Sequence, residues 1–264
     1  MRKLIISFLL LTFVLYAGTA KAKSCKLTVQ VVEYPPLATK QDNGDWSGLN
    51  FDYLDALFKE ARCRYQVVEA PHARGIKLIE EGMIDMALNL SRTAEREKHF
   101  HFIGPQRIET IKLAAKSSMY PKITSWAQFD DLNARLIWQI GAFYGDKIEQ
   151  KIQQNLTLKH KMLYSADNVA MVDTVNKGGA DGFFLLVDFF NYQKANNPAY
   201  ANIELHPITI NSNDVFFGFS KKSVNSDMLQ RFQVAYQNLA DKGVLQKIEQ
   251  QYANQQKIRL TSNN

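Results

Sequence analysis

The chain has 264 residues and a formal net charge of +6, a length that suits one large or two ordinary domains. Its basic residues form neither a Lys/Arg run nor a stripe interleaved with aromatic residues, which argues against nucleic acid as a partner. After the N-terminal segment no stretch reaches about 18 uninterrupted apolar residues, so the sequence predicts no membrane-spanning helix there.

The N-terminal segment has the pattern of a secretory signal peptide at residues 1–22. Arg2 and Lys3 form its positive start, residues 4–17 are apolar, and Ala20-Lys21-Ala22 is a cleavage site of small residues. Cleavage removes three basic residues and no acidic one, which lowers the net charge from +6 to +3. We therefore expect a soluble, exported mature chain that starts near Lys23.

Two cysteines lie just before two predicted strands of the mature chain. Cys25 precedes a strand at 26–32, and Cys63 precedes a strand at 65–69. Parallel neighbouring strands bring their starts together, and two cysteines in an exported protein are expected to form a bond. We predict a structural Cys25–Cys63 disulfide, because the chain has no Cys-x-x-Cys motif that would indicate a redox role.

The first part of the mature chain alternates strands with helices. In chain order, the patterns predict a strand at 26–32, a helix at 51–61, a strand at 65–69, a helix at 71–82 and a strand at 84–90. This order is typical of a parallel sheet with crossover helices.

The end of the strand at 84–90 carries the most informative pattern. It runs directly into Ser91-Arg92-Thr93-Ala94-Glu95-Arg96, which is typical of a helix start. In an open α/β sheet, ligands bind where a strand ends at a helix N-terminus, and free N–H groups there favour an anion. Arg96 adds a guanidinium that can bind a carboxylate through two parallel hydrogen bonds.

A second set of α/β elements begins near Trp126. The predicted elements are a strand at 135–140, a loop at 141–146 that leads into a helix, a strand at 162–165, a helix at 167–178, strands at 181–187, 203–208 and 215–220, and helices at 225–241 and 244–253. The last ten or so residues are polar, and we expect them to be frayed.

A series of short motifs extends over nearly the whole mature chain. They are Tyr34-Pro35-Pro36, Gly48 with Asp52, Gly82-x-x-Asp85, Ser91-x-Thr93-x-Glu95-Arg96, Phe102 with Pro105, Asp131-Leu132, Gly179-Ala180-Asp181, and Leu239-x-x-x-Gly243-x-x-x-x-Ile248-x-x-x-Tyr252. In this order, behind a signal peptide, they resemble the bacterial extracellular solute-binding proteins of family 3, the polar amino-acid-binding class.

The resemblance implies an α/β fold of the two-lobed, type II periplasmic-binding kind, with two parallel or mixed-sheet lobes joined by two hinge crossings. Lobe 1 is expected at 23–109 plus 216–264 and lobe 2 at 110–215. The hinges are expected near residues 107–111 and 213–217, with the ligand held between lobes that close on it. It further implies a periplasmic monomer that delivers its ligand to an inner-membrane ABC permease, without cofactor, metal or enzyme activity.

The resemblance also assigns ligand-binding residues in the first lobe. Arg96 matches the arginine that binds the ligand α-carboxylate, and Ser91 matches a hydroxyl and N–H donor to the same group. Asn89 takes a position that often offers a polar contact, and Tyr34 matches an aromatic wall over the ligand. The structural alternatives are a surface arginine paired with a neighbouring glutamate, a plain helix cap, and ordinary packing.

The second lobe departs from the family pattern at Leu186, where an aspartate usually holds the ligand ammonium. An ammonium left unpaired against Leu186 would be costly. Asp188 and Glu33 are the two acids we consider as replacements. Tyr144 is the candidate hydroxyl donor of the second-lobe loop, because residues 142–143 lack the small hydroxyl side chains that the family has there. The ligand is therefore a polar amino acid, an unusual amino acid or another small carboxylate.

Arg74 is a further candidate, because Pro71-His72-Ala73-Arg74 resembles a Pro-x-x-Arg element of one branch of the family. In that branch the arginine faces the cleft, where Arg74 would bind a second acidic group of the ligand. A plain surface arginine explains the residue equally well.

Two other functions stay open from the sequence. One is a periplasmic dehydratase-like enzyme acting on a cyclic carboxylate, with Glu33 and His72 as the nameable acid–base groups. The other is a ligand-sensing input for a membrane receptor. A metal site at His99 and His101 is disfavoured, because no third ligand is placed beside them.

Overall fold

An eight-stranded sheet dominates the computed structural model, which describes residues 25–118 and 122–262. Its strand order is β4-β1-β5-β10-β6-β9-β7-β8. The strands are β1 (Lys26–Val31), β4 (Arg64–Glu69), β5 (Met86–Ser91), β6 (Phe100–Lys116), β7 (Leu136–Gln139), β8 (Met162–Ser165), β9 (Gly182–Leu186) and β10 (Ile203–Ser220). A separate antiparallel pair consists of β2 (Thr39–Lys40) and β3 (Trp46–Ser47). The signal peptide predicted at residues 1–22 lies outside the described residues.

Helices cover the sheet along its length. They are α2 (Leu49–Glu60), α3 (His72–Glu80), α4 (Ala94–Glu97), α5 (Trp126–Asp130), α6 (Asp146–Gln154), α7 (Leu156–His160), α8 (Asn168–Asn176), α9 (Val187–Asn196), the 3₁₀ turn η1 (Pro198–Tyr200), α10 (Ser226–Asp241) and α11 (Val244–Ser262). In the described ranges, none of these helices is long and apolar enough to cross a membrane. The expectation of a frayed C-terminal segment was wrong up to Ser262, because residues 253–260 are rich in good helix formers that extend α11.

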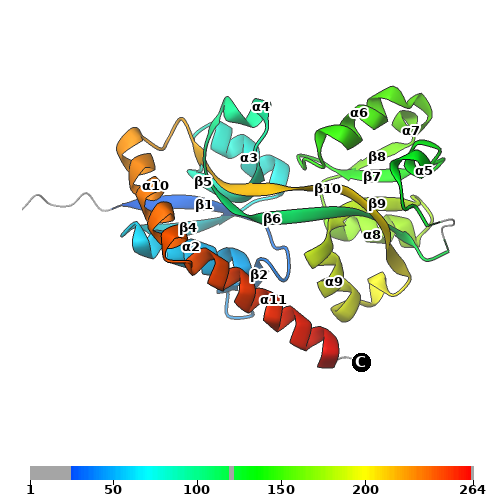
Figure 1. Ribbon diagram of the computed structural model, residues 1–264. Coiled ribbons are helices and arrows are strands. Elements are labelled where there is room, and N and C mark those ends of the chain that lie inside the picture. Colours follow the sequence, from blue (N-terminus) through cyan, green and yellow to red (C-terminus); the bar gives the residue numbers. More distant parts are fainter. Residues whose placement is uncertain (1–24, 119–121, 263–264) are drawn as a thin grey trace, which may run out of the picture.

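Two long strands connect the two halves of the molecule (Figure 1). The first half contains β1, β4 and β5 with α2–α4, α10 and α11, and the second half contains β7–β9 with α5–α9. Strands β6 and β10 pair antiparallel from Phe100 opposite Ser220 to Lys116 opposite Ile203, so both run through the two halves. The sequence predicted separate strands at 203–208 and 215–220; they form one strand because the intervening polar residues pair with β6.

The parallel units expected from the sequence are present in both halves. Strand β1 pairs in parallel with β4 and β5, and β7 pairs in parallel with β8 and β9. In the first half, the register sets Lys26 opposite Arg64, which brings the preceding residues together. The predicted Cys25–Cys63 disulfide is confirmed, with a Cα–Cα distance of 4.7 Å.

This disulfide makes a direct chemical prediction. Unreduced, denatured protein is expected to show no free thiol in a thiol-reagent assay, and full reduction is expected to release two thiols per chain, since Cys25 and Cys63 are its only cysteines. Two free thiols before reduction would contradict the bond.

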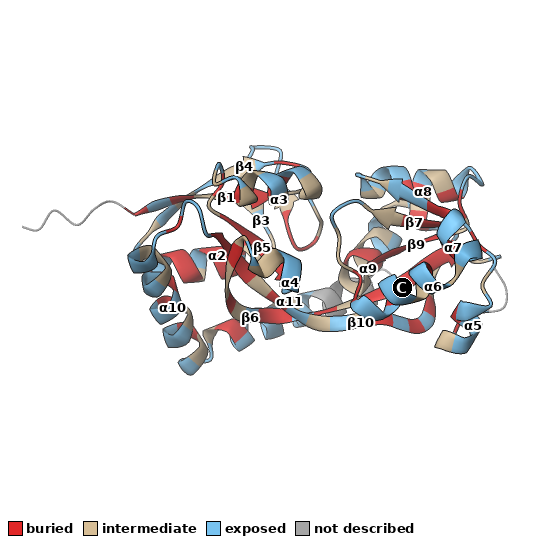
Figure 2. Cartoon of the chain, turned by 90° about the horizontal axis from the view of Figure 1, so that it is seen from above, coloured by how far each residue is buried: buried red, intermediate tan, exposed pale blue. Residues whose placement is uncertain are grey.

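Each half buries its own apolar core, and the cores meet near Leu186. The first core lies around α2, β1 and α10, where Phe217 and Phe232 are fully buried. In the second half, Phe183 and Phe184 of β9 are buried in separate clusters on the two faces of the sheet, as expected for a strand covered by helices on both sides. Figure 2 shows buried residues along the strands of both halves and exposed residues on outward helix faces. Leu186 packs against three of these clusters, so it marks the place where the halves come together.

Candidate functional site

A cavity of about 130 Å³ lies between the first and second halves, beside the strands that connect them. Its polar lining comes from both halves and includes Asn89, Ser91, Arg96, Glu109 and Gln139. Its volume is close to that of an engineered cavity of about 150 Å³ that holds benzene. The site is therefore of a size for a small molecule, and it combines an apolar wall with few polar groups, as ligand pockets usually do.

Arg96 spans the two halves at this cavity. Its Nη1 donates to the Ser91 carbonyl at 2.9 Å, and its Nη2 donates to the Gly141 carbonyl of the second half at 3.0 Å. Burial lowers the pKa of Arg96, against the opposing attraction of Glu109, but an arginine remains charged. The guanidinium has further N–H donors beyond these two bonds, which leaves it able to bind an anion in the cavity.

The acids beside Arg96 in the sequence do not neutralise it. Glu95 pairs with Lys98, and Glu97 pairs with Arg92, so both of these carboxylates have other partners. Arg96 is therefore not a surface arginine paired with a neighbouring glutamate, which was the structural alternative.

The backbone at this turn contributes less than the sequence pattern suggests. The expected helix is α4, which has only four residues and so carries little of a helix dipole. Thr93 is its N-cap, and the Thr93 Oγ1 accepts the N–H of Arg96, so this N–H is already bonded. The anion-binding capacity of the turn therefore depends on the side chain of Arg96.

Glu109 lies beside Ser91 and was missed by the sequence analysis. The Ser91 Oγ donates to the Glu109 Oε1 at 3.2 Å, and the two residues are 4% and 6% exposed. Burial raises the pKa of Glu109 to about 7, although Arg107, the Ser91 hydrogen bond and Arg96 act in the opposite direction. Glu109 is in the predicted hinge segment at 107–111, and a charged residue in a connecting segment was the signal that could have identified it.

Gly141 of the second half approaches the first half closely at His72 and Arg96. Its φ is +84°, and a Cβ on Gly141 would lie 2.9 Å from the Cα of Ala73, so the approach requires glycine. Burial and the nearby charge of Arg96 lower the pKa of His72 to about 4, while its hydrogen bond to the Gly141 backbone opposes this shift. The His72 side chain, which forms part of the cavity wall, is therefore uncharged at pH 7.

Two tyrosines complete the walls of the cavity. The ring of Tyr34 stacks on Phe189 of α9, with a centroid distance of 4.0 Å and an interplanar angle of 17°. The Tyr144 hydroxyl donates to the Phe184 carbonyl at 3.1 Å, so toward a ligand it can offer only its oxygen lone pairs. Burial raises the pKa of both tyrosines, which keeps their hydroxyls neutral.

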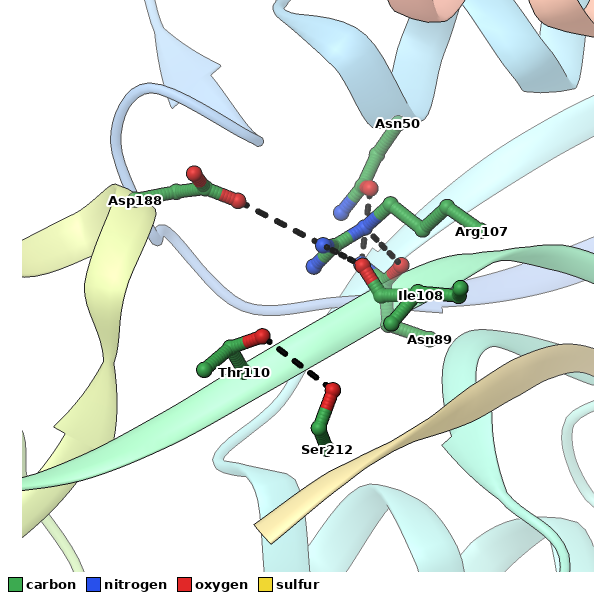
Figure 3. A network of polar contacts seen from close by, with 7 residues as sticks. All are labelled: Asn50, Asn89, Arg107, Ile108, Thr110, Asp188 and Ser212. Carbon is green, nitrogen blue, oxygen red and sulfur yellow. Dashed lines mark hydrogen bonds and ion pairs between the residues drawn. The ribbon is translucent and has the colours of Figure 1, made fainter. Parts of the chain in front are cut away.

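Asn89 belongs to a polar network that joins the halves beside the cavity (Figure 3). Its Nδ2 donates to the Asn50 Oδ1 at 2.7 Å, and its Oδ1 accepts from the Arg107 Nε at 3.3 Å. Arg107 in turn reaches the Asp188 Oδ2 of α9 at 3.4 Å, with side chains 2% and 42% exposed. Asn89 has a φ of +51°, a left-handed conformation that asparagine adopts more readily than most residues.

The structure brings five of the seven residues proposed from the sequence to the cavity: Tyr34, Asn89, Ser91, Arg96 and Tyr144. The side chains of Glu33 and Arg74 are exposed and do not line it. Asp188 is bound to Arg107 and does not line it either, whereas Leu186 does. In residues 25–118 and 122–262, no group of three or more His, Cys, Asp or Glu side chains is placed to hold a metal ion.

Known proteins share both the sequence pattern and the fold. The model of the bacterial extracellular solute-binding proteins, family 3, matches residues 27–255. The chain is 19% identical to an ancestral arginine-binding protein bound to arginine, with a TM-score of 0.72, covering 86% of this chain and 97% of that chain. It is 17% identical to a putative L-cystine ABC transporter from Listeria monocytogenes, with a TM-score of 0.71, covering 86% and 95%.

A third similar structure is the ancestral amino acid-binding protein AncCDT-1, a precursor of cyclohexadienyl dehydratase. It is 21% identical, with a TM-score of 0.66, covering 86% of this chain and 94% of that chain. The comparison with curated proteins gave no match. At these identities the similar structures show the fold, the two-lobed α/β fold of periplasmic binding proteins. Because the family model extends over most of the chain, the protein belongs to family 3 of the bacterial extracellular solute-binding proteins.

Proposed function

We propose that the protein captures a small carboxylate, with a polar amino acid as the first candidate, in the cavity between its halves. The observation that carries this proposal is Arg96, whose charge faces a cavity lined from both halves and is not neutralised by Glu95 or Glu97. Ser91, whose carbonyl accepts from Arg96 and whose hydroxyl donates to Glu109, lies at the same end of the cavity. An arginine with free N–H donors in a small, largely buried site is suited to a carboxylate.

The halves act as two lobes that close on the ligand. Lobe 1 consists of residues 23–109 plus 216–264, and lobe 2 of residues 110–215. Support comes from the β6–β10 ladder. Its register irregularities flank residues 211–215, which overlap the expected hinge at 213–217 and lie opposite the expected hinge at 107–111. Binding energy then stabilises the closed arrangement, and the measured affinity includes the free energy of closure.

A substitution at Gly141 tests whether the lobes close on the ligand. Gly141→Ala is expected to weaken ligand binding about 10-fold, because the added Cβ meets the Ala73 backbone only when the lobes are together. Gly178→Ala is the matched control, since Gly178 also has a positive φ but a Cβ there meets nothing within 4 Å. Calorimetric titration of both variants measures the effect. Equal affinities would show that this contact between the halves does not form on binding.

The protein is expected to work in the periplasm as a monomer and to deliver its ligand to an ABC permease. Family membership supports this role, and so does the similarity to a putative L-cystine ABC transporter. Capture of the ligand-loaded form by a permease in membrane vesicles, with uptake of radiolabelled ligand, would support transport. Binding to a receptor kinase without uptake would support a sensing role instead.

One observation favours an enzyme as the second candidate. Glu109, with a pKa near 7, lies in the same cavity as His72, and general acid–base catalysis works best with such a pKa. A dehydratase-like reaction on a cyclic carboxylate would consume the ligand. Mass spectrometry of the mixture after incubation separates the two functions, because a binding protein returns its ligand unchanged.

The first experiment combines native mass spectrometry with a thermal-shift screen. Protein purified from its own periplasm is weighed intact to identify a retained ligand. Refolded, ligand-free protein is then screened against the twenty L-amino acids and the corresponding 2-hydroxy acids. Stabilisation by at least one of these compounds supports the proposal, and the absence of any stabilisation contradicts it.

A further inference from the structure

The proposed site lacks an obvious partner for the ammonium group of an amino acid. Leu186, at the position where an acid was expected, presents an apolar side chain to the cavity. Asp188 is paired with Arg107 outside the cavity, and the exposed Glu33 lies outside it as well. Among the described residues that line the cavity, Glu109 is the only acid.

We infer that Glu109 binds the ammonium group of an amino acid whose carboxylate is held by Arg96. The amine site is then on the connecting strand β6 instead of at the end of β9. This inference rests on the proposed function, because it assigns the second half of the same ligand.

The geometry around Ser91 supports this assignment. The Ser91 hydroxyl contacts Glu109 at 3.2 Å, while the carbonyl of the same residue accepts from Arg96 at 2.9 Å. The acidic and the basic group therefore both contact Ser91, so they lie near each other in the cavity. An α-amino acid carries its ammonium and carboxylate on one carbon atom, so one ligand beside Ser91 can approach both groups.

Glu109 also has unused capacity for hydrogen bonds. Within the described residues, its carboxylate accepts one hydrogen bond, from Ser91. The bonds of the nearby Arg107 go to Asn89, Ile108 and Asp188, so Arg107 attracts Glu109 without bonding it. A carboxylate that is 6% exposed and has one neutral donor is stabilised strongly by a cation that enters the cavity.

The other groups around Glu109 determine how binding depends on pH. Arg107 and Arg96 favour its charged form, Asp188 disfavours it, and the hydroxyls of Tyr34 and Tyr144 face it as neutral groups. With the lobes together, as in the structure, burial raises the pKa of Glu109 to about 7, so its carboxylate is partly protonated at neutral pH. Binding of an ammonium requires the carboxylate, so uptake of an amino acid releases a proton, and affinity falls as the pH drops below 7.

The test compares each L-amino acid of the screen with its 2-hydroxy acid, in which a hydroxyl replaces the ammonium. Wild-type protein is expected to prefer at least one amino acid over its 2-hydroxy acid by about 10- to 100-fold. In Glu109→Gln, which keeps the shape of the side chain, this preference is expected to disappear through weaker amino-acid binding. Asp188→Asn and Glu33→Gln are the comparison variants, and both are expected to keep the preference.

Each contrary result has a distinct meaning. A preference that survives in Glu109→Gln, or that disappears in Asp188→Asn or Glu33→Gln instead, would overturn the inference and leave the proposed function standing. Equal binding of both acids by the wild type would do the same. No binding of any compound by the wild type would overturn the proposed function and the inference together.

A second measurement uses only the wild type and so does not depend on a variant that folds. Calorimetric titrations at pH 7 in buffers of different ionisation enthalpy count the protons released by the best-binding amino acid. Release of a fraction of a proton per ligand is expected, because the raised pKa of Glu109 leaves its carboxylate partly protonated at that pH. Release of no protons would contradict the assignment.

Discussion

Replacing Arg96 with alanine is expected to weaken the binding of the best amino acid from the screen by about 100-fold or more. The variant loses the charged donors to the ligand carboxylate, and each hydrogen bond to a charged group contributes about 1.5–3 kcal/mol. It also loses the contact with the Gly141 carbonyl, which joins the halves. Isothermal titration calorimetry measures the loss, and far-ultraviolet circular dichroism is expected to remain unchanged.

Arg74→Ala is the matched comparison for this experiment. Arg74 was the other arginine proposed from the sequence, but its side chain is exposed and lies outside the cavity. It is therefore expected to bind like the wild type. Normal binding by Arg96→Ala, or a large loss in Arg74→Ala, would show that the carboxylate end of the site is assigned to the wrong residue.

Glu109→Gln is expected to change how the stability of the protein, with its lobes together as in the structure, depends on pH. Burial raises the pKa of Glu109 from 4.5 to about 7, so the folded protein holds this proton more tightly than the unfolded chain. The stabilisation is fully present below pH 4.5 and is lost as the pH rises through 7. Each pKa unit corresponds to about 1.4 kcal/mol, which makes the loss about 3 kcal/mol.

The measurement is urea denaturation of wild type and Glu109→Gln between pH 4.5 and 8. Glutamine does not ionise, so the variant is expected to gain about 3 kcal/mol relative to the wild type across this range. His72 acts in the opposite direction: its pKa is lowered to about 4, so its contribution is lost as the pH falls from 6.5 toward 4. Both proteins contain His72, so its effect cancels in the difference. A difference that stays constant with pH would contradict a buried Glu109 with a raised pKa.

The sequence predicted those parts of the fold that depend on residues close together in the chain. The alternating apolar residues of β5 and the cap at Thr93 are local signals, and they located the turn that carries Ser91 and Arg96. The parallel units followed from the order of strands and helices, and the Cys25–Cys63 bond followed from those units. Family motifs added the two-lobed arrangement.

Local patterns failed where pairing between distant segments decided the structure. Residues 209–214 are mostly polar and have weak strand propensity, but in the structure they continue β10 because β6 supplies their hydrogen bonds. The α3 helix has buried Gly75 and Ile79 on one face, and its packing through that face leaves Arg74 exposed. The sequence spacing alone did not decide whether Arg74 faces the cavity or the solvent.

The sequence by itself determined the class of fold, the disulfide and the turn that carries Ser91 and Arg96, because each depends on a short stretch of chain or on the order of elements. Only the tertiary structure decided which residues from distant parts of the chain meet this turn at the cavity. Glu109 lies 18 residues after Ser91, and Gly141 lies 45 residues after Arg96. These residues meet because two long strands pair across both halves, and burial between the halves then raises the pKa of Glu109.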